Sequence, residues 1–382
     1  MSESSFAGFD PYDALRGRNV PKWMRSNRRL RQIAIQLRKR LPLPTAALYG
    51  VTPFVMAKTA GSMLTAAARN GDSLGIAAAM DALLEADGNL GAGAWGYEFD
   101  VQTRWAFYPA GSPNLIATVF VGRGLGTAGI AGAQPDIREG LSSAAGFLLN
   151  RLYAAGDLPS FRYTLTSEQL VHNANLLGAG LVAMEGCLSG HCERVEQAVD
   201  CALTSVTAQR EDGSWPYGDD ASLGWSDTFH TAYNLDGLLQ VWLASGDVRV
   251  RDSLDSGVEQ WTQGFFGGQG EPHYYMDKGY PYDVHGAGTA IDVAARLATW
   301  GFETGDLAER VAIWTRGNLI DSTSGATYYQ KHRFWTDKRH FVRWGDAHWA
   351  LGCSSLALMR AGRRDPLEAA VALASGVVDD AG

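Results

Sequence analysis

Apolar positions along the chain gather in helix-length segments, and no alternating β-branched runs of the kind that predict strands interrupt them. One group of segments is both small and apolar, with Gly and Ala at many positions. A segment of this kind covers residues 52–68, and five more begin near Asn114, Asn173, His230, His285 and His348. Successive starts lie 55 to 63 residues apart. This spacing predicts a helical repeat.

More charged segments alternate with the small apolar ones. They include CERVEQAVDCALTSV (192–206), VRVRDSLDSGVEQW (248–261) and, near the end of the chain, DPLEAAVALASG (365–376). A repeat of about 57 residues has room for two helices of some four turns and their connections. Gly and Ala allow helices to approach closely around a crowded centre, whereas charges suit an outer wall. Six such pairs predict an all-α fold, an (α/α)6 toroid with inner and outer rings of helices.

The predicted toroid is a single domain over residues 46–382, preceded by an N-terminal segment, residues 1–45, with a basic helix. Residues 1–40 hold ten Lys and Arg against three acids, although the whole chain has a net charge of −8. The run KWMRSNRRLRQIAIQLRKR (22–40) predicts a helix with apolar residues among the cationic ones. It either packs across the acidic remainder or docks on an anionic membrane surface, and the sequence leaves both interpretations open.

Aromatic-x-Tyr tags precede the small apolar segments, at Trp95-Gly-Tyr97, Phe161-Arg-Tyr163 and Trp215-Pro-Tyr217, with degenerate versions at 273–275 and 327–329. Turn residues stand just before each tag. Because all inner helices of a toroid run the same way, their N-termini ring one mouth, and the tags lie beside it. We therefore expect a set of aromatic side chains to bind substrate at this mouth: Trp95, Tyr97, Trp215, Tyr217, Trp225, Tyr282 and Trp344.

Polar residues begin several of the predicted inner helices, and Asp and His recur together in Asp227-x-x-His230, Asp283-x-His285 and Asp346-x-His348. An Asp near a helix start accepts backbone N–H groups, which lowers its pKa, and it can hold a nearby His in one tautomer. We predict His230 as acid or base, Asp227 as its orienting partner, and Asp283, His285 and His348 as further catalytic or binding groups. Tyr233 is a candidate proton donor. Ordinary capping and core hydrogen bonding are the alternative for each pair.

Other polar side chains are expected to bind substrate at the same mouth. Asn114, Asn173 and Asn175 stand at inner-helix starts, and Arg343 and Asp346 lie in the cationic, aromatic run QKHRFWTDKRHFVRWGDAHW (330–349). Arg104 is expected to contribute from across the ring. Arg grips carboxylates and phosphates bidentately and stacks on aromatic rings, so the run predicts an anion-binding wall, unless its charges are simply solvated.

Several classes of function find no support in the sequence. The negative net charge argues against nucleic acid as a partner, and the four cysteines form no ligand or disulfide pattern. GLGTAG (124–129) lies inside a predicted helix without a preceding strand, so it does not predict a dinucleotide site. We expect no cofactor and no metal. We also expect a cytoplasmic protein, with peripheral contact at the inner membrane face through residues 22–40 as a further hypothesis.

The segment QREDGSW (209–215) resembles the Q-x-x-x-G-x-W repeat of the squalene cyclase/prenyltransferase superfamily, whose members are α/α toroids. The D-x-D-D and D-D-x-x-D acids of terpene cyclases have no counterpart in this sequence. A closer resemblance is to toroid proteins of bacterial exopolysaccharide biosynthesis loci, on FDPYDAL (9–15), IQLRKRLP (35–42) and DTFHTAYNLDGL (227–238). This resemblance implies a glycan context.

These features together predict a glycan-active enzyme that works by acid/base chemistry, as a hydrolase, lyase or epimerase, on an anionic saccharide in bacterial polysaccharide metabolism. Aromatic faces stack sugars, cations hold a carboxylate, and a His/Asp/Tyr set transfers protons. Two alternatives stay open. One is a terpenoid cyclase or transferase acting on a prenyl diphosphate, and the other is a non-catalytic glycan-binding or assembly protein.

Overall fold

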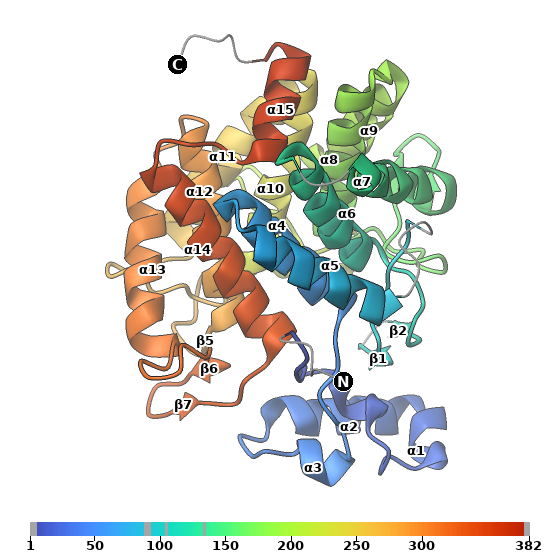
Figure 1. Cartoon of the computed structure of the whole chain (residues 1–382), viewed down its shortest axis with the longest axis vertical. Coiled ribbons are helices and arrows are strands. Elements are labelled where there is room, and N and C mark those ends of the chain that lie inside the picture. The colour runs from blue at the N-terminus through green and yellow to red at the C-terminus, as the bar shows by residue number, and fades with distance from the viewer. Residues whose placement is uncertain (1–5, 88–92, 104–105, 133–134, 378–382) are drawn as a thin grey trace.

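Six inner helices form a closed ring in the computed structural model, which describes residues 6–87, 93–103, 106–132 and 135–377 (Figure 1). They are α4 (Ala57–Asn70), α6 (Leu115–Ile130), α8 (His172–Ser189), α10 (Thr228–Ser245), α12 (Val284–Thr299) and α14 (Ala347–Arg360). Each packs against the next, and α14 returns to α4. The predicted (α/α)6 toroid is confirmed.

Outer helices follow the first five inner ones and pack against them. They are α5 (Ser73–Asp87), α7 (Pro135–Phe147), α9 (Cys192–Val206), α11 (Val248–Gly264) and α13 (Gly305–Leu319). The last helix, α15 (Pro366–Ser375), is different, because it packs against α6, α8 and α10 at the C-terminal end of the ring. The prediction that 365–376 completes the outer wall is therefore wrong. Leu367, Val371 and Ala372 are buried there, and the buried Glu368 finds a cationic partner in Arg296.

Glycines allow the close approach of inner helices that the sequence predicts. A Cβ at Gly124 of α6 would lie 2.4 Å from the carbonyl oxygen of Gly61 in α4, so neither helix could carry a larger residue without moving apart. Gly124 belongs to GLGTAG, which is therefore a helix-packing segment, as expected from the missing strand.

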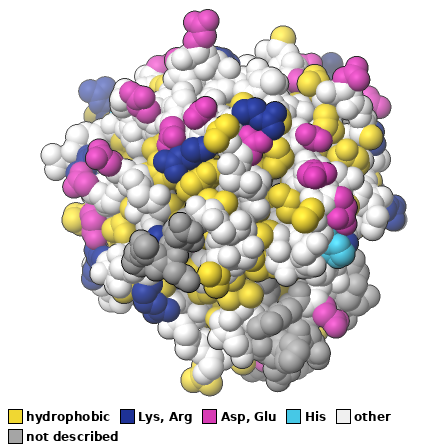
Figure 2. Space-filling model, turned by 90° about the horizontal axis from the view of Figure 1, so that it is seen from above, with side chains coloured by type: hydrophobic (Ala, Val, Ile, Leu, Met, Phe, Trp, Pro, Cys, Tyr) yellow, Lys and Arg dark blue, Asp and Glu magenta, His cyan; other side chains and the backbone are white. Residues whose placement is uncertain are grey.

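Ion pairs fill the interior of the ring near α15. Arg123 and Arg296 both bind Asp236, each at 2.5 Å, while Arg69 binds Asp292 at 2.8 Å and Asp365 at 2.7 Å. These charges are buried and mutually compensated, so removing one would leave its partners uncompensated. This end of the molecule is shown in Figure 2, where cationic and anionic surface groups are interspersed with apolar ones.

The N-terminal segment lies beneath the opposite end of the ring (Figure 1). It contains η1 (Asp13–Arg16), α1 (Lys22–Ser26), α2 (Arg28–Arg40) and α3 (Ala46–Tyr49). Arg31 donates to Gln102 Oε1 at 2.7 Å, and Arg339 donates to the Arg38 carbonyl oxygen at 2.6 Å. The basic helix thus packs on the body through these contacts, while Ile33 and Leu37 remain exposed on its surface.

Short strands and irregular helices connect the rings at the same end. The strands pair as β1 (Val101–Gln102) with β2 (Phe107–Tyr108), β3 (Tyr153–Ala154) with β4 (Ser160–Phe161), and β5 (Tyr282–Asp283) with β6 (Gln330–Lys331) and β7 (Thr336–Asp337), all antiparallel. The remaining elements are η3 (Leu148–Leu152), η4 (Ala221–Leu223) and η5 (Val342–Asp346). No helix within the described ranges is long and apolar enough to cross a bilayer. All four cysteines are unpaired.

Candidate active site

The aromatic-x-Tyr tags build the wall of a pocket at the mouth of the ring. The first aromatic of each regular tag is buried (Trp95, Phe161 and Trp215), whereas the tyrosines line the pocket (Tyr97, Tyr163 and Tyr217). The tags also tie neighbouring repeats together. The N–H of Leu115, at the start of α6, donates to the Tyr163 carbonyl oxygen at 2.9 Å, and that of His172, at the start of α8, donates to the Tyr217 carbonyl oxygen at 3.1 Å.

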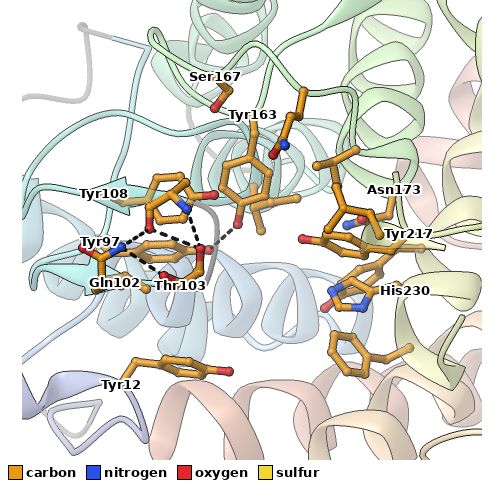
Figure 3. Close-up of a pocket in the computed structure, with 18 of the residues that line it drawn as sticks. Tyr12, Tyr97, Gln102, Thr103, Tyr108, Tyr163, Ser167, Asn173, Tyr217 and His230 are labelled. Atoms are coloured by element: carbon orange, nitrogen blue, oxygen red, sulfur yellow. Dashed lines mark hydrogen bonds between the residues drawn. The ribbon is translucent and has the colours of Figure 1, made fainter. Parts of the chain in front are cut away.

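The pocket has a volume of about 730 Å³ and is lined mainly by aromatic and neutral polar side chains. Figure 3 shows Tyr97 and Tyr108 on one side, facing Tyr217 and His230 on the other. Tyr217 stacks on Trp225 with ring centroids 4.4 Å apart. Flat, partly polar walls of this kind suit a ligand with apolar faces and hydroxyl edges.

Asp227 and His230 form the hydrogen-bonded pair that the sequence predicts. Asp227 Oδ1 accepts the backbone N–H of His230 at 2.9 Å and so caps α10, while Oδ2 lies 2.8 Å from His230 Nδ1. A carboxylate only accepts hydrogen bonds, so Nδ1 carries the proton of the neutral ring. The other nitrogen, Nε2, is then free to accept a proton, and the side chain lines the pocket. The polar stripe of α10 is completed by Thr231 and Asn234, which line a small recess beside this pair.

The second Asp/His pair has a different arrangement. Asp283 Oδ1 accepts the backbone N–H of His285 at 2.9 Å, but its side chain binds the indole N–H of Trp344 and the amide of Gln330. The His285 ring instead bonds through Nε2 to the hydroxyl of Tyr233, at 2.9 Å. Burial raises the pKa of Asp283 in spite of its hydrogen bonds, so the expected lowering is wrong for this carboxyl.

The third Asp/His pair is not a pair in the structure. Asp346 accepts from the hydroxyl of Thr327 at 2.8 Å and lies 2.6 Å from Nε2 of His340. His348 is buried, and its ring stacks on His285 with centroids 3.8 Å apart. The prediction that this carboxylate orients His348 is wrong, because the π-helical turn η5 directs the Asp346 side chain toward 327 and 340 instead.

The histidines at the pocket floor are held neutral. Burial, and then the neighbouring His348, Lys58 and Arg343, lower the pKa of His285 well below its usual range. Burial, Lys58 and Arg343 do the same for the pKa of His348. Burial also raises the pKa of Tyr233 well above 10, so this hydroxyl keeps its proton at neutral pH. The floor therefore presents neutral imidazoles and a protonated Tyr233 hydroxyl, which can donate a hydrogen bond or a proton.

The N-terminal segment contributes to the site. Arg343 lines the pocket and donates from Nε to Asp10 Oδ2 at 2.6 Å, an ion pair that is buried on both sides. Tyr12 also lines the pocket and lies 2.6 Å from Lys39 Nζ through its hydroxyl. Among the Lys and Arg residues of 330–349, all within the described ranges, Arg343 is the one that lines the pocket. Arg339 instead binds Asp337 and the end of α2.

Nine of the predicted site residues line the pocket: Tyr97, Asn173, Tyr217, Trp225, His230, Tyr233, His285, Arg343 and Trp344. Asp227, Asp283 and His348 support them from behind. Others serve the fold: Trp95 is buried, Asn114 caps α6, Asn175 binds Phe161 and Cys201, Trp215 donates to Ser205, and Tyr282 packs on Trp314. Asp346 is not among the residues that line the pocket in the described part of the chain. Arg104 lies outside the described residues.

Sequence reasoning missed several residues of the pocket. Tyr163 and Tyr275 stand in tags, so the repeat itself could have placed them there. Tyr12 and Gln36 come from the N-terminal segment, whose position no repeat predicts. Lys58 also lines the pocket. It is a charged residue at the start of an otherwise small and apolar inner helix, and this isolated charge is the sequence feature that could have placed it in the site.

No known protein family and no curated protein matches the chain. Solved structures do match its fold. An unsaturated glucuronyl hydrolase specific for heparin has a TM-score of 0.61 at 13% identity, covering 80% of this chain and 86% of that one. The cellobiose 2-epimerase of Bacillus thermoamylovorans B4167 has a TM-score of 0.61 at 10% identity, covering 80% and 88%. A GH76 alpha-mannanase of Bacteroides thetaiotaomicron has a TM-score of 0.62 at 11% identity, covering 82% and 88%. At these identities the likeness establishes the toroid fold alone.

Proposed function

We propose that the protein is a carbohydrate-active enzyme that moves protons at a saccharide bound in the aromatic pocket. The observation that carries this proposal is the joint placement of stacked aromatic rings and the Asp227–His230 pair on one pocket wall. The Tyr217–Trp225 stack offers a flat surface for a pyranose ring. His230 Nε2 then lies at the edge of that surface, where a base could reach a sugar hydroxyl, a C–H or an attacking water.

The remaining pocket groups favour an anionic saccharide. Arg343 lines the wall, and its Nη groups make no hydrogen bond to other residues of the described chain, so they are available to a carboxylate. Asn173, whose Oδ1 has no hydrogen-bond partner among the described residues, adds a neutral polar group suited to a hydroxyl. A prenyl chain would leave such groups without partners, which supports a glycan over an isoprenoid. The names of the fold neighbours, which are hydrolases and epimerases of sugars, agree with this choice.

The test is a screen of the purified protein against acidic oligosaccharides, neutral reducing sugars and prenyl diphosphates, with His230→Ala in parallel. Turnover of a saccharide that the substitution abolishes is the expected result. Consumption of a prenyl diphosphate, or saccharide turnover that His230→Ala leaves intact, would contradict the proposal. Saccharide binding without turnover of any compound would favour a binding or assembly role.

We also propose that the N-terminal segment contacts an anionic membrane surface. Ile33 and Leu37 lie one turn apart on α2 and are 52% and 45% exposed, and Arg29 and Arg40 flank them on the same helix face. Between residues 14 and 71 the chain contains no acid. Exposed apolar residues flanked by cations are the features by which interfacial helices bind anionic lipids.

Cosedimentation with vesicles containing or lacking phosphatidylglycerol tests this contact. We expect binding to the anionic vesicles alone, release at high salt, and loss in the double variant Ile33→Glu/Leu37→Glu. Leu74→Glu, at an 83% exposed position on α5, is the matched control and should bind as the wild type does. Equal binding of the double variant and the control would refute the contact.

A further inference from the structure

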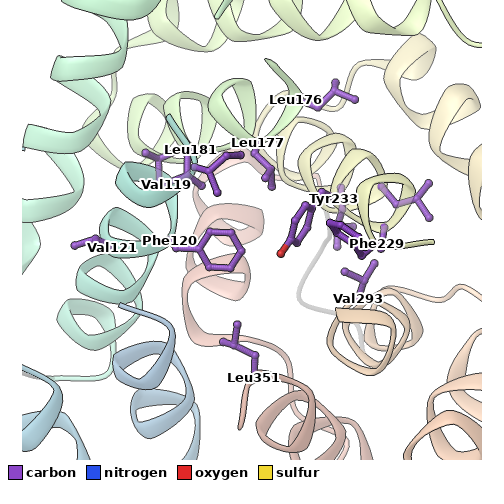
Figure 4. Close-up of a cluster of buried hydrophobic side chains, with 14 of the residues drawn as sticks. Val119, Phe120, Val121, Leu176, Leu177, Leu181, Phe229, Tyr233, Val293 and Leu351 are labelled. Atoms are coloured by element: carbon purple, nitrogen blue, oxygen red, sulfur yellow. The ribbon is translucent and has the colours of Figure 1, made fainter. Parts of the chain in front are cut away.

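Lys58 occupies the floor of the pocket, where none of the proton-transfer roles proposed above uses it. It is the second residue of α4, it is 3% exposed, and its side chain lines the pocket. Its Nζ lies 4.1 Å from the ring centroid of Phe120 and 5.7 Å from that of Tyr233. Figure 4 shows these two rings facing each other across the centre of the inner ring.

No carboxylate of the described residues forms an ion pair with Lys58, which is unusual for a buried lysine. The charges that act on Lys58 are those of Arg343, which opposes its protonation, and Asp10, which favours it, and these two groups are paired with each other. The pKa values of the nearby His285 and His348 are lowered, so their imidazoles add no charge. Glu98 faces the start of α4 but accepts the backbone N–H of Ala57. Burial first, and then the charge of Arg343, lower the pKa of Lys58 well below its usual range.

Lys39 provides a contrast within the same site. It also lies near the pocket, but its Nζ is 2.6 Å from the Tyr12 hydroxyl. Although burial opposes its charge, the interaction with Tyr12 raises the pKa of Lys39. Lys39 thus has a hydrogen-bonded partner that favours its charge, whereas Lys58 has only ring contacts among the described residues and its pKa is shifted toward the neutral amine. A desolvated lysine beside another cation is the environment that activates lysine as a nucleophile toward carbonyl compounds.

We propose that Lys58 forms a reversible imine with the open-chain carbonyl group of a reducing saccharide bound in the pocket. This inference rests on the proposed function and specifies it, since the substrate would be an aldose or ketose with a free reducing end. The substrate carboxylate that Arg343 is expected to bind would then belong to the same sugar or to the neighbouring sugar of the saccharide.

The chemistry balances with groups already in the site. The lone pair of Nζ forms the bond to the carbonyl carbon, the C=O π pair moves to oxygen, and one proton passes from nitrogen to that oxygen. The resulting carbinolamine takes a further proton and loses water as C=N forms, which leaves a protonated imine. Tyr233, hydrogen-bonded to His285 at 2.9 Å, is the donor placed beside Lys58. Addition of water reverses each step.

Reductive trapping tests the inference directly. The full-length protein is incubated at neutral pH with D-glucuronic acid and cyanoborohydride, which reduces imines, and labelled peptides are mapped by mass spectrometry. We expect labelling of Lys58 at least tenfold above that of Lys278, because Lys278 is exposed and lies outside the pocket that would hold the sugar. The methyl glycoside of the same sugar has no free carbonyl and should label neither residue. Lys58→Arg keeps a long basic side chain at this position but has no amine that can form an imine, so it should lose the pocket adduct.

The outcomes separate this inference from the proposed function. Saccharide turnover that depends on His230, with no excess labelling at Lys58, would overturn the imine and leave the enzyme assignment standing. Labelling of Lys58 by glycolaldehyde but by no sugar would overturn the saccharide as its partner. Reductive methylation with ¹³C-formaldehyde gives a second measure in the wild-type protein, free of any folding defect in a variant. A Lys58 dimethylamine resonance that titrates together with those of the surface lysines would also overturn the inference.

Discussion

Replacing Asp227 by Asn separates the structural role of the Asp227–His230 pair from its chemical role. In the native site Oδ1 caps α10 through the His230 N–H, and Oδ2 accepts from Nδ1. Asn keeps an oxygen for the cap but places an NH₂ group opposite the ring. Nδ1 must then become the acceptor, and the ring proton moves to Nε2, the nitrogen available to the pocket. The variant therefore retains the fold and loses the base.

The hydrogen bonds that each substitution of Asp227 removes determine the expected loss of stability. Asp227→Ala removes a helix cap, worth about 1 kcal/mol, and a buried charge-assisted hydrogen bond, worth about 1.5–3 kcal/mol. We expect it to lower the free energy of unfolding by about 2.5–4 kcal/mol. Asp227→Asn keeps the cap and exchanges a charged for a neutral bond, so the loss should be about 1 kcal/mol. Turnover in both variants should fall by about 10²–10⁴, the usual contribution of a positioned acid or base.

The assay combines urea unfolding with long-range ¹H–¹⁵N NMR on protein labelled at its eight histidines, with His230→Gln identifying the resonance. The wild type should show the Nδ1–H tautomer of His230, and Asp227→Asn should show the Nε2–H tautomer. Asp247→Asn is the matched control, because Asp247 caps α11 without a histidine partner. An unchanged tautomer in Asp227→Asn, or turnover equal to that of the control, would refute the reasoning.

Two further predictions concern the pocket floor and the helix start beside it. Tyr233→Phe leaves His285 Nε2 buried without its partner, so the free energy of unfolding should fall by about 1–3 kcal/mol and turnover should fall with it, as measured by urea unfolding and the saccharide assay. Glu98 caps α4 through the Ala57 N–H, and burial raises its pKa to about 7. The folded state thus holds a proton that the unfolded state has released, and stability should fall by up to about 3 kcal/mol as pH rises from 4.5 to 7. Glu98→Gln should flatten that part of the urea-unfolding profile, and an unchanged slope would contradict the assignment.

The repeat made most of the fold predictable. Small apolar helices at regular intervals define the inner ring, because only residues such as Gly61 and Gly124 permit the observed contact of α4 with α6. The position of α15 was not predictable in this way. Its composition suits a buried helix as well as an outer wall, and the Arg296–Glu368 pair that holds it against the C-terminal end of the ring joins residues of different repeats.

The candidate site was predictable where the chemistry is local. Asp227 and His230 are three residues apart on one helix start, so helical geometry alone brings them together. Asp346 and His348 are closer in sequence, yet the π-helical turn between strand β7 and α14 separates their side chains. Tyr12 and the Asp10–Arg343 pair depend on how residues 6–16 dock on the mouth, and no periodicity encodes that contact.

The central claim is that the Asp227–His230 pair transfers a proton at a saccharide in the aromatic pocket. Its most direct test is the ratio of kcat for the wild type to that for His230→Gln, on whichever saccharide the screen identifies. Gln fills similar space but cannot act as a base at neutral pH. The account predicts that kcat falls by about 10²–10⁴ while KM changes far less. A kcat within a few-fold of the wild-type value, with the fold intact, would contradict it.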